Sequence, residues 1–288
     1  MKSNNKLYIV TVATEDKYYY QYLKESCIKN GIDLITLGYG QKWQGFAWKL
    51  ELILNFLKNI NAHDIVCFID GYDVICIRKL EELINVFKNI TLREKCKIIV
   101  SKDCNNNSTE IDKITKNIIF GECKNTNLNS GTYIGYAYNL TDIIGNAYKE
   151  VNDPTADDQI LLTKYCNIRP NDFYIDINNE VFAVVCKMFQ QIDDLFIIDN
   201  NKIIYNNSQP FFIHAPGFTF LDKLLIKIGY SDSNNKNLIK INDDLQKNSS
   251  NKMFNTLIHF AKEYLEFIIL IVLCIIFIFI IIKRRNVL

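Results

Sequence analysis

The sequence predicts a Rossmann-like α/β domain that is followed by a membrane-spanning helix. Short β-branched apolar runs alternate with segments of helical spacing, and one buried run ends abruptly in acidic residues. An unbroken apolar stretch near the C-terminus predicts the membrane helix. We therefore expect residues 1–230 to form the α/β domain, residues 231–255 a polar linker, and residues 256–288 a transmembrane anchor with a basic tail.

The alternation begins at Leu7–Ala13, which is β-branched and apolar on both faces, as expected of a buried parallel strand. The elements predicted next, in chain order, are a helix over Tyr18–Asn30, a strand over Asp33–Leu37, a helix over Trp48–Asn59, a strand over Asp64–Ile69, a helix over Leu80–Asn89 and a strand over Lys97–Val100. Such an alternation is typical of a Rossmann-like layer.

The pattern is less regular in the second half of the domain. Lys102–Asn129 is predicted to be rich in loops. Helices are expected over Thr141–Val151 and Asp157–Tyr165, and a late strand over Phe211–His214. Ser231–Asn251 is dominated by Asn, Ser, Lys and Asp, which is typical of a flexible linker.

Composition excludes several classes of function. The 33 basic residues nearly balance the 32 acidic residues, so we expect no nucleic acid as partner. Gly38 and Gly40 are not followed by a third glycine at the dinucleotide-binding spacing. The nine cysteines show none of the short paired spacings of a zinc site. Cys104 and Cys123 flank an Asn-rich loop and are candidates for a disulfide, although spacing alone cannot fix a pairing.

The C-terminal apolar stretch runs from Phe267 to Ile282 and is closed by Lys283–Arg285. Extended back to Tyr264 it has about 19 residues, close to the ~20 that cross a bilayer. It predicts a single-pass C-terminal anchor. Two topologies stay open. No secretory signal is visible within Met1–Ala13, which suggests tail anchoring with a cytosolic domain, whereas the basic tail favours the opposite orientation.

Two acidic residues, Asp70 and Asp73, follow the predicted buried strand Asp64–Ile69. Ligands of open α/β sheets bind beyond the carboxyl ends of the strands. Two carboxylates separated by a Gly-containing turn can converge on one hard divalent cation, which would neutralise a diphosphate. The alternative for such a short pattern is that Asp70 caps a turn and Asp73 is exposed to solvent.

The three histidines differ in their surroundings. His63 lies in a polar turn, and His259 adjoins the apolar stretch. His214 ends a predicted strand and is followed by a Gly-containing loop, so it is the best placed of the three for a ligand, although a structural role stays open from its position alone.

The order of these motifs resembles the glycosyltransferase domain of the procollagen lysyl hydroxylase/glycosyltransferase family. The resemblance covers roughly Leu7 to Phe220. The matching strings are Thr11–Thr14, Thr36–Gly38 with Trp43, Phe68–Ile75, Leu128–Gly131 with Ile134–Ala137, Asp157–Gln159, and Ile213–His214. It implies a GT-A type nucleotide-sugar glycosyltransferase fold.

The resemblance also implies roles for individual residues. Asp70, Asp73 and His214 would bind Mn²⁺ or Mg²⁺, and Tyr72 would stack on the uracil of a UDP-sugar. Asp157 and Asp158 would face donor and acceptor, and Gln159 would hold sugar hydroxyls. The residues implied for the nucleotide-sugar pocket are Thr11, Val12, Ala13, Thr14, Lys49, Asn129 and Gly217.

The implied reaction moves glucose or galactose from UDP-glucose or UDP-galactose to a protein acceptor, such as hydroxylysine or galactosyl-hydroxylysine of a collagen-like protein. Two departures from the family's pattern concern the sugar side of the implied pocket. Cys104 is followed by asparagines rather than by an aromatic residue, and Pro216 replaces the family's Asn. Two alternatives therefore stay open, a glycan or lipid-linked acceptor and an inactive binding domain at a membrane. The family's hydroxylase half is not expected here, because His63 and His259 are not placed to complete an iron site with His214.

Overall fold

A six-stranded mixed sheet forms the centre of the α/β domain, with strand order β2–β1–β3–β6–β5–β7. Its strands are β1 (Leu7–Val12), β2 (Leu34–Leu37), β3 (Ile65–Ile69), β5 (Ile98–Lys102), β6 (Leu128–Tyr136) and β7 (Phe173–Asp176). The predicted parallel strand at the N-terminus is confirmed, because β1 pairs parallel with both β2 and β3. The strand β6 runs antiparallel between β3 and β5.

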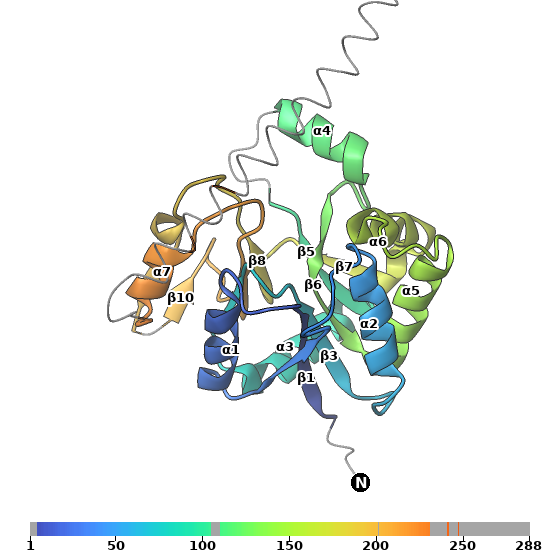
Figure 1. Cartoon of the computed structure of the whole chain (residues 1–288), viewed down its shortest axis with the longest axis horizontal. Helices are drawn as coiled ribbons and strands as arrows, with labels where there is room; N and C mark the ends of the chain where they lie inside the picture. The colour runs from blue at the N-terminus through green and yellow to red at the C-terminus, as the bar shows by residue number, and fades with distance from the viewer. Residues whose placement is uncertain (1–4, 105–109, 201, 231–240, 242–246, 248–288) are drawn as a thin grey trace, which may run out of the picture. The chain divides into compact units, whose positions relative to one another are not determined.

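Helices cover both faces of this sheet, namely α1 (Tyr20–Lys29), α2 (Trp48–Leu57), α3 (Leu83–Glu94), α5 (Ala137–Lys149) and α6 (Asp158–Ile168). The helix α4 (Glu110–Phe120) contacts α6, and α7 (Asp222–Lys227) contacts the segment Asp193–Leu195. Figure 1 shows α2, α5 and α6 together at one side of the sheet. Alternate residues of β3 serve the two cores: Val66 and Phe68 pack in the cluster with α2 and α5, and Cys67 in the cluster with α1 and α3.

A smaller sheet of order β4–β11–β8 lies beside the main one. It consists of β4 (Val74–Cys76), β8 (Phe182–Val184) and β11 (Phe212–His214). A separate hairpin is formed by β9 (Ile197–Asp199) and β10 (Lys202–Ile204), and three 3₁₀ turns are η1 (Leu80–Glu82), η2 (Pro170–Asp172) and η3 (Asp193–Leu195).

Two disulfides fasten these parts. Cys104–Cys186 joins the residues that follow β5 to those that follow β8, and thus links the two sheets. Cys123–Cys166 joins the segment before β6 to α6. The candidate pairing of Cys104 with Cys123 is therefore wrong. Each cysteine meets a partner that the sheet topology brings close, which sequence spacing does not reveal.

The strands and helices predicted before residue 101 are confirmed to within a few residues. The loop-rich interpretation of Lys102–Asn129 is wrong in part, since α4 occupies Glu110–Phe120 and β6 begins at Leu128. The strand β6 was not predicted because its first four residues, Leu128–Gly131, include Asn, Ser and Gly, which have little preference for strands. The predicted helix over Thr141–Val151 begins earlier, at Ala137.

The computed structural model describes residues 5–104, 110–200 and 202–230, together with residues 241 and 247. The described residues up to 241 belong to one compact unit. The predicted anchor at residues 256–288 and nearly all of the predicted linker at 231–255 lie outside the described residues. Within the described ranges, no helix combines the length and apolar character that a membrane span requires.

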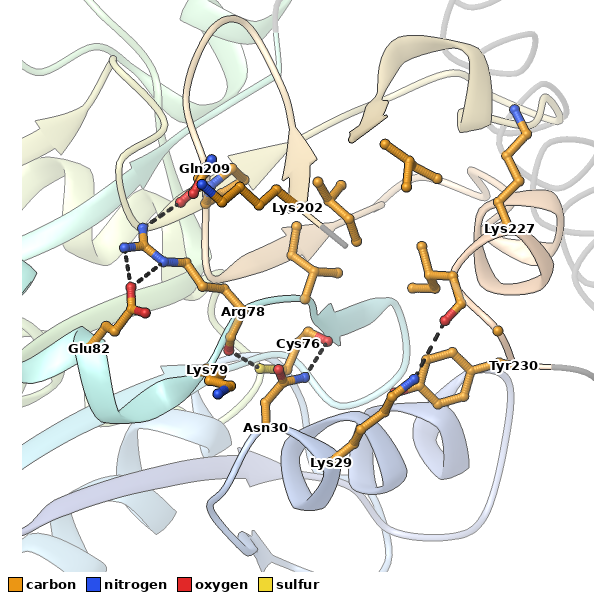
Figure 2. A pocket seen from close by; sticks show the side chains of 16 residues that line it. Lys29, Asn30, Cys76, Arg78, Lys79, Glu82, Lys202, Gln209, Lys227 and Tyr230 are labelled. Carbon is orange, nitrogen blue, oxygen red and sulfur yellow. Dashed lines mark hydrogen bonds and ion pairs between the residues drawn. The ribbon is translucent and has the colours of Figure 1, made fainter. Parts of the chain in front are cut away.

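A cavity of about 690 Å³ opens beside the small sheet (Figure 2). Its lining comes from the C-terminal end of α1, from β4 and the residues after it, from the β9–β10 hairpin and from the C-terminal end of α7. Neither Asp70 nor Asp73, the acidic residues that follow β3, is among the residues that line this cavity.

Candidate active site

The turn between β3 and β4 passes from the main sheet to the small sheet and contains Asp70 and Asp73. The backbone N–H of Asp70 donates to the carbonyl of Gly131 on β6, at 2.8 Å. Gly71 packs directly on β1, and a Cβ atom there would lie 2.6 Å from the carbonyl oxygen of Val12. Only glycine fits at this close approach, so the sequence Asp-Gly-Tyr-Asp holds the turn against β1.

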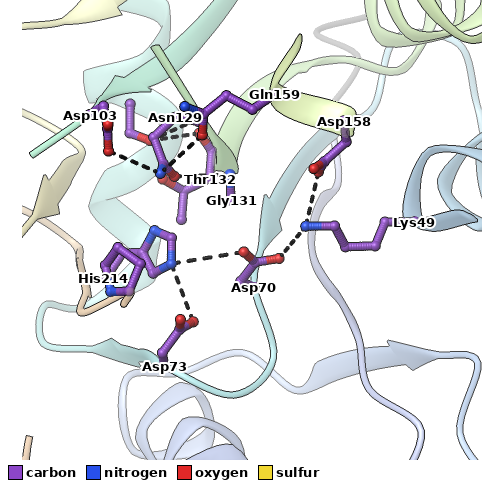
Figure 3. Close-up of polar contacts among 12 residues, drawn as sticks. Lys49, Asp70, Asp73, Asp103, Asn129, Gly131, Thr132, Asp158, Gln159 and His214 are labelled. Atoms are coloured by element: carbon purple, nitrogen blue, oxygen red, sulfur yellow. Dashed lines mark hydrogen bonds and ion pairs between the residues drawn. The ribbon is translucent and has the colours of Figure 1, made fainter. Parts of the chain in front are cut away.

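The strand β11 brings His214 to the same place. It pairs antiparallel with β4, so that His214 lies opposite Val74, and the N–H of Ala215 donates to the carbonyl of Asp73 at 2.8 Å. Nε2 of His214 lies 3.2 Å from Oδ1 of Asp73 and 3.8 Å from Oδ2 of Asp70 (Figure 3). Three residues that sequence analysis grouped are thus together in space.

These three side chains fit a divalent cation. Asp70, Asp73 and His214 each offer one ligand atom, and these atoms all lie within 4.8 Å of one another. Neither ring nitrogen of the buried His214 forms a regular hydrogen bond among the described residues. A Cβ on Gly131 would lie 2.4 Å from Cε1 of His214 and 2.5 Å from Oδ2 of Asp70, so the glycine keeps the space between them open. Two carboxylates and one imidazole suit Mn²⁺ or Mg²⁺.

Electrostatics couple the ligands to one another. Burial alone would lower the pKa of His214, but the carboxylates of Asp73 and Asp70 outweigh it and the pKa is raised. Burial would raise the pKa of Asp73, but His214 reverses this and the pKa is lowered. A cation bound at this place would compete with a proton for the imidazole nitrogen.

Lys49 lies beside the proposed metal ligands. It is buried on α2, and its Nζ lies 2.9 Å from Oδ1 of Asp70 and 2.9 Å from Oδ2 of Asp158 (Figure 3). Burial alone would lower the pKa of Lys49, but Asp158 and Asp70 raise it above its ordinary value. The ammonium charge is thus kept in a site from which a lone lysine would lose it.

The acids at the start of α6 have different roles in the structure. Asp157 is the N-cap of α6, and its Oδ1 accepts from the N–H groups of Gln159 at 2.9 Å and Ile160 at 3.0 Å. Asp158 is buried and faces Lys49. Gln159 is buried as well, and its Oε1 lies 3.5 Å from Nδ2 of Asn129 on β6. Asp158 and Gln159 therefore contact Lys49 and Asn129, while one oxygen of Asp157 is engaged in capping.

The predicted nucleotide-binding residues at the end of β1 are close to Tyr72. The Tyr72 hydroxyl accepts from the N–H of Thr14 at 2.9 Å and lies 3.2 Å from the Thr14 hydroxyl. Thr11, Val12 and Ala13 are buried, and Thr11 lies against the turn at Gly71. The structure thus brings Tyr72 and the segment from Thr11 to Thr14 together.

Gly217 is less closely tied to these residues. It lies in the loop after β11 with φ +70, and no heavy atom lies within 4 Å of where its Cβ would be. Its assignment to the nucleotide-sugar pocket stays a prediction.

Asp103 is a site neighbour that sequence analysis missed. It directly follows β5, as Asp70 directly follows β3, so the same rule of strand ends would have found it. Its Oδ1 accepts from Nδ2 of Asn129 at 3.4 Å, and its Oδ2 forms an ion pair with Lys116 at 2.8 Å. Asp103 thereby orients Asn129, whose Oδ1 in turn accepts from the N–H of Gly131 at 3.0 Å.

Comparison with known proteins gives a match of residues 3–228 to a family model described as the PLOD GT domain. An uncharacterized protein of Acanthamoeba polyphaga mimivirus is 24% identical over 205 residues, which cover 66% of this chain and 41% of that protein. The procollagen-lysine,2-oxoglutarate 5-dioxygenase of Drosophila melanogaster is 29% identical over 180 residues, which cover 56% of this chain and 22% of that protein. The match thus spans less than half the length of each relative.

Solved structures with a similar course of the chain include a glycosyltransferase involved in the glycosylation of the major capsid of PBCV-1. It has a TM-score of 0.45 and 10% identity, with 84% of this chain and 99% of that chain covered. Mouse xyloside xylosyltransferase 1 has a TM-score of 0.40 and 10% identity, with 64% and 88% covered.

Proposed function

The chain belongs to the family of PLOD glycosyltransferase domains, and we propose that it transfers glucose or galactose from a UDP-sugar to hydroxylysine or galactosyl-hydroxylysine of a collagen-like protein. We further propose that the reaction depends on Mn²⁺ or Mg²⁺ held by Asp70, Asp73 and His214. The observation that supports this most is the convergence of these ligands beside the Lys49–Asp158 ion pair. The predicted C-terminal span leads us to propose attachment to a membrane as well.

The proposed roles follow from charge. A divalent cation at Asp70, Asp73 and His214 would supply positive charge to the diphosphate leaving group. Lys49, 2.9 Å from both Asp70 and Asp158, would balance the charge of these carboxylates and hold them in place beside the cation. Tyr72, fastened through its hydroxyl to Thr14, offers an aromatic ring for the uracil.

Asp158 is the acid that we propose acts on the sugars. Burial and the nearby Asp70 raise its pKa, while Lys49 opposes them, and the net shift is upward. A carboxylate whose pKa lies above its ordinary value is a better proton acceptor for a hydroxyl group. Gln159, which lies next to Asn129, would hold sugar hydroxyls through its amide. Asp157 starts the helix that positions both.

Transfer assays test this function directly. UDP-glucose and UDP-galactose would each be supplied, with Mn²⁺ or with EDTA, to hydroxylysyl peptides, galactosyl-hydroxylysyl peptides and free glycans. We expect Mn²⁺-dependent transfer to one of the peptides. Transfer to free glycans alone would refute the proposed acceptor, and no donor turnover in any combination would refute the enzymatic function.

The metal ligands are tested by Asp73→Ala. We expect this variant to lose Mn²⁺-dependent UDP binding in calorimetry, because an anionic ligand worth several kcal/mol is missing. Asp199→Ala on the exposed strand β9 removes a carboxylate that is not among these ligands and is the matched control. Unchanged UDP affinity in Asp73→Ala would contradict the assignment.

A further inference from the structure

The cavity beside the small sheet has the size of a ligand site. Its volume of about 690 Å³ falls within the range of roughly 300–1,000 Å³ that is usual for small-molecule pockets. We propose that this cavity binds a phosphate-bearing ligand with an apolar portion, in addition to the proposed sugar-nucleotide.

The charge of the lining favours an anion. Among the described residues that line the cavity, five are basic and one is acidic. The basic residues come from separate segments of the chain, and they are Lys29, Arg78, Lys79, Lys202 and Lys227, with Glu82 as the acid. Figure 2 shows Arg78 and Lys202 on one side of the hollow and Lys29 and Lys227 on the other. A concave surface lined by one sign of charge concentrates ligands of the opposite sign.

Two of these cations are already paired. Nε of Arg78 donates to Glu82 at 2.9 Å, and its guanidinium also packs over the ring of Phe211 at 4.3 Å. Lys227 forms an ion pair with Asp193 at 2.5 Å. Arg78 is thereby held in a fixed position, from which its planar group can bind phosphate oxygens.

The remaining cations are available to a ligand. Over the part of the chain that the structure describes, Lys79 and Lys202 form no ion pair with an acidic side chain. Lys29 donates a long hydrogen bond, 3.5 Å, to the carbonyl of Ile228, and its Nζ lies 4.7 Å from the centre of the Tyr230 ring. Three lysines are thus not neutralised by acids, enough to match the charge of a phosphate monoester.

The apolar part of the lining is the reason for proposing a ligand with an apolar portion. It includes Ile198, Ile203, Pro210, Ile228 and Tyr230. Inorganic phosphate alone would leave this surface exposed to water, whereas a phosphate ester with a hydrocarbon or aromatic group would cover it. Burial of apolar surface is favourable at roughly 25 cal/mol per Å².

The cavity is distinct from the proposed donor site. The strand β4 separates them, since Asp73 precedes its first residue and Cys76, its last residue, lines the cavity. Loss of binding here would leave the metal ligands intact, and a failure of the proposed transferase reaction would not bear on this cavity.

The test uses calorimetry on the full-length chain in detergent, with EDTA present so that phosphate cannot bind through a metal. The probes are inorganic phosphate, phenyl phosphate and a water-soluble short-chain phosphatidic acid. We expect the two esters to bind more tightly than inorganic phosphate and to bind more weakly as salt is added. Lys79→Glu with Lys202→Glu should weaken ester binding by about tenfold or more. Lys79→Arg with Lys202→Arg should retain it.

Lys164→Glu, on the exposed side of α6, is the matched control and should bind the esters like the wild type. Tighter binding of phosphatidic acid than of phenyl phosphate would identify a membrane phospholipid as the source, and the reverse order a soluble ester. The proposal is overturned if no probe binds, if inorganic phosphate binds as tightly as the esters, or if the double Glu variant binds them unchanged.

Discussion

Gly131→Ala tests whether the space between two proposed ligands is used for a cation. The added Cβ would lie 2.4 Å from Cε1 of His214 and 2.5 Å from Oδ2 of Asp70. Non-bonded carbon atoms rest at about 3.5–4.0 Å, so the imidazole has to retreat by roughly 1 Å. Metal–ligand distances tolerate changes of only about 0.2 Å. We therefore expect Mn²⁺ affinity to fall by at least about tenfold although all three ligands remain.

Calorimetry with Mn²⁺ and UDP measures this loss, and urea unfolding measures the cost of overpacking, which is typically about 1–3 kcal/mol. The matched control is Gly135→Ala on the same strand, where the Cβ would meet the side chain of Leu140 at 3.1 Å and not a proposed ligand. Gly135→Ala should lose stability and keep its Mn²⁺ affinity. The reasoning is refuted if Gly131→Ala binds Mn²⁺ as tightly as the wild type does.

Three further substitutions follow from the structure. Lys49→Met leaves Asp70 and Asp158 without their cation, so the free energy of unfolding should fall by about 3–5 kcal/mol in urea titrations, and less when Asp158→Asn is added. If the losses in the free energy of unfolding caused by Lys49→Met and Asp158→Asn simply add in the double variant, this coupling is contradicted. Asp158→Asn should lower transfer by roughly 10²–10⁴-fold with UDP affinity unchanged, whereas Asp157→Ala should cost about 1 kcal/mol of stability and leave turnover alone, as steady-state kinetics and melting would show. Burial raises the pKa of Asp176 from 3.8 to about 6 although backbone N–H groups bond to it. The folded state therefore holds the proton more tightly, and the stability that this group contributes is lost as the pH rises from about 4 to 6. The destabilisation by Asp176→Asn should thus be largest near pH 4 and smaller by roughly 3 kcal/mol at pH 7, and a difference independent of pH would contradict it.

The sequence was most informative where strands end. Buried strands such as Ile65–Ile69 are apolar on both faces, and the change to Asp70 marks the edge of the sheet clearly. His214 could be singled out by its place at a strand end, and the family resemblance implied its role as a ligand. Such a change from apolar to polar residues involves neighbours in the sequence, so it can be recognised without the structure.

Contacts between distant segments were not predictable. The Lys49–Asp158 ion pair joins two helices that are far apart in the chain, and no periodic pattern indicates that a buried lysine on α2 meets an acid on α6. The same holds for Cys104–Cys186, whose partners are separated by 82 residues. The antiparallel course of β6, which positions Asn129 and Gly131, was likewise hidden by residues of low strand preference.

The Cys104–Cys186 disulfide has a consequence for how the proposed ligand set is held together. Asp70 follows a strand of the main sheet, whereas Asp73 and His214 adjoin strands of the small sheet, so the proposed cation would bridge the two sheets that this disulfide also joins. In a reducing environment only non-covalent contacts would hold the ligands in register. Protein disulfides persist mainly in oxidising compartments. The redox state of the surroundings would therefore decide how firmly the proposed ligand set is held together.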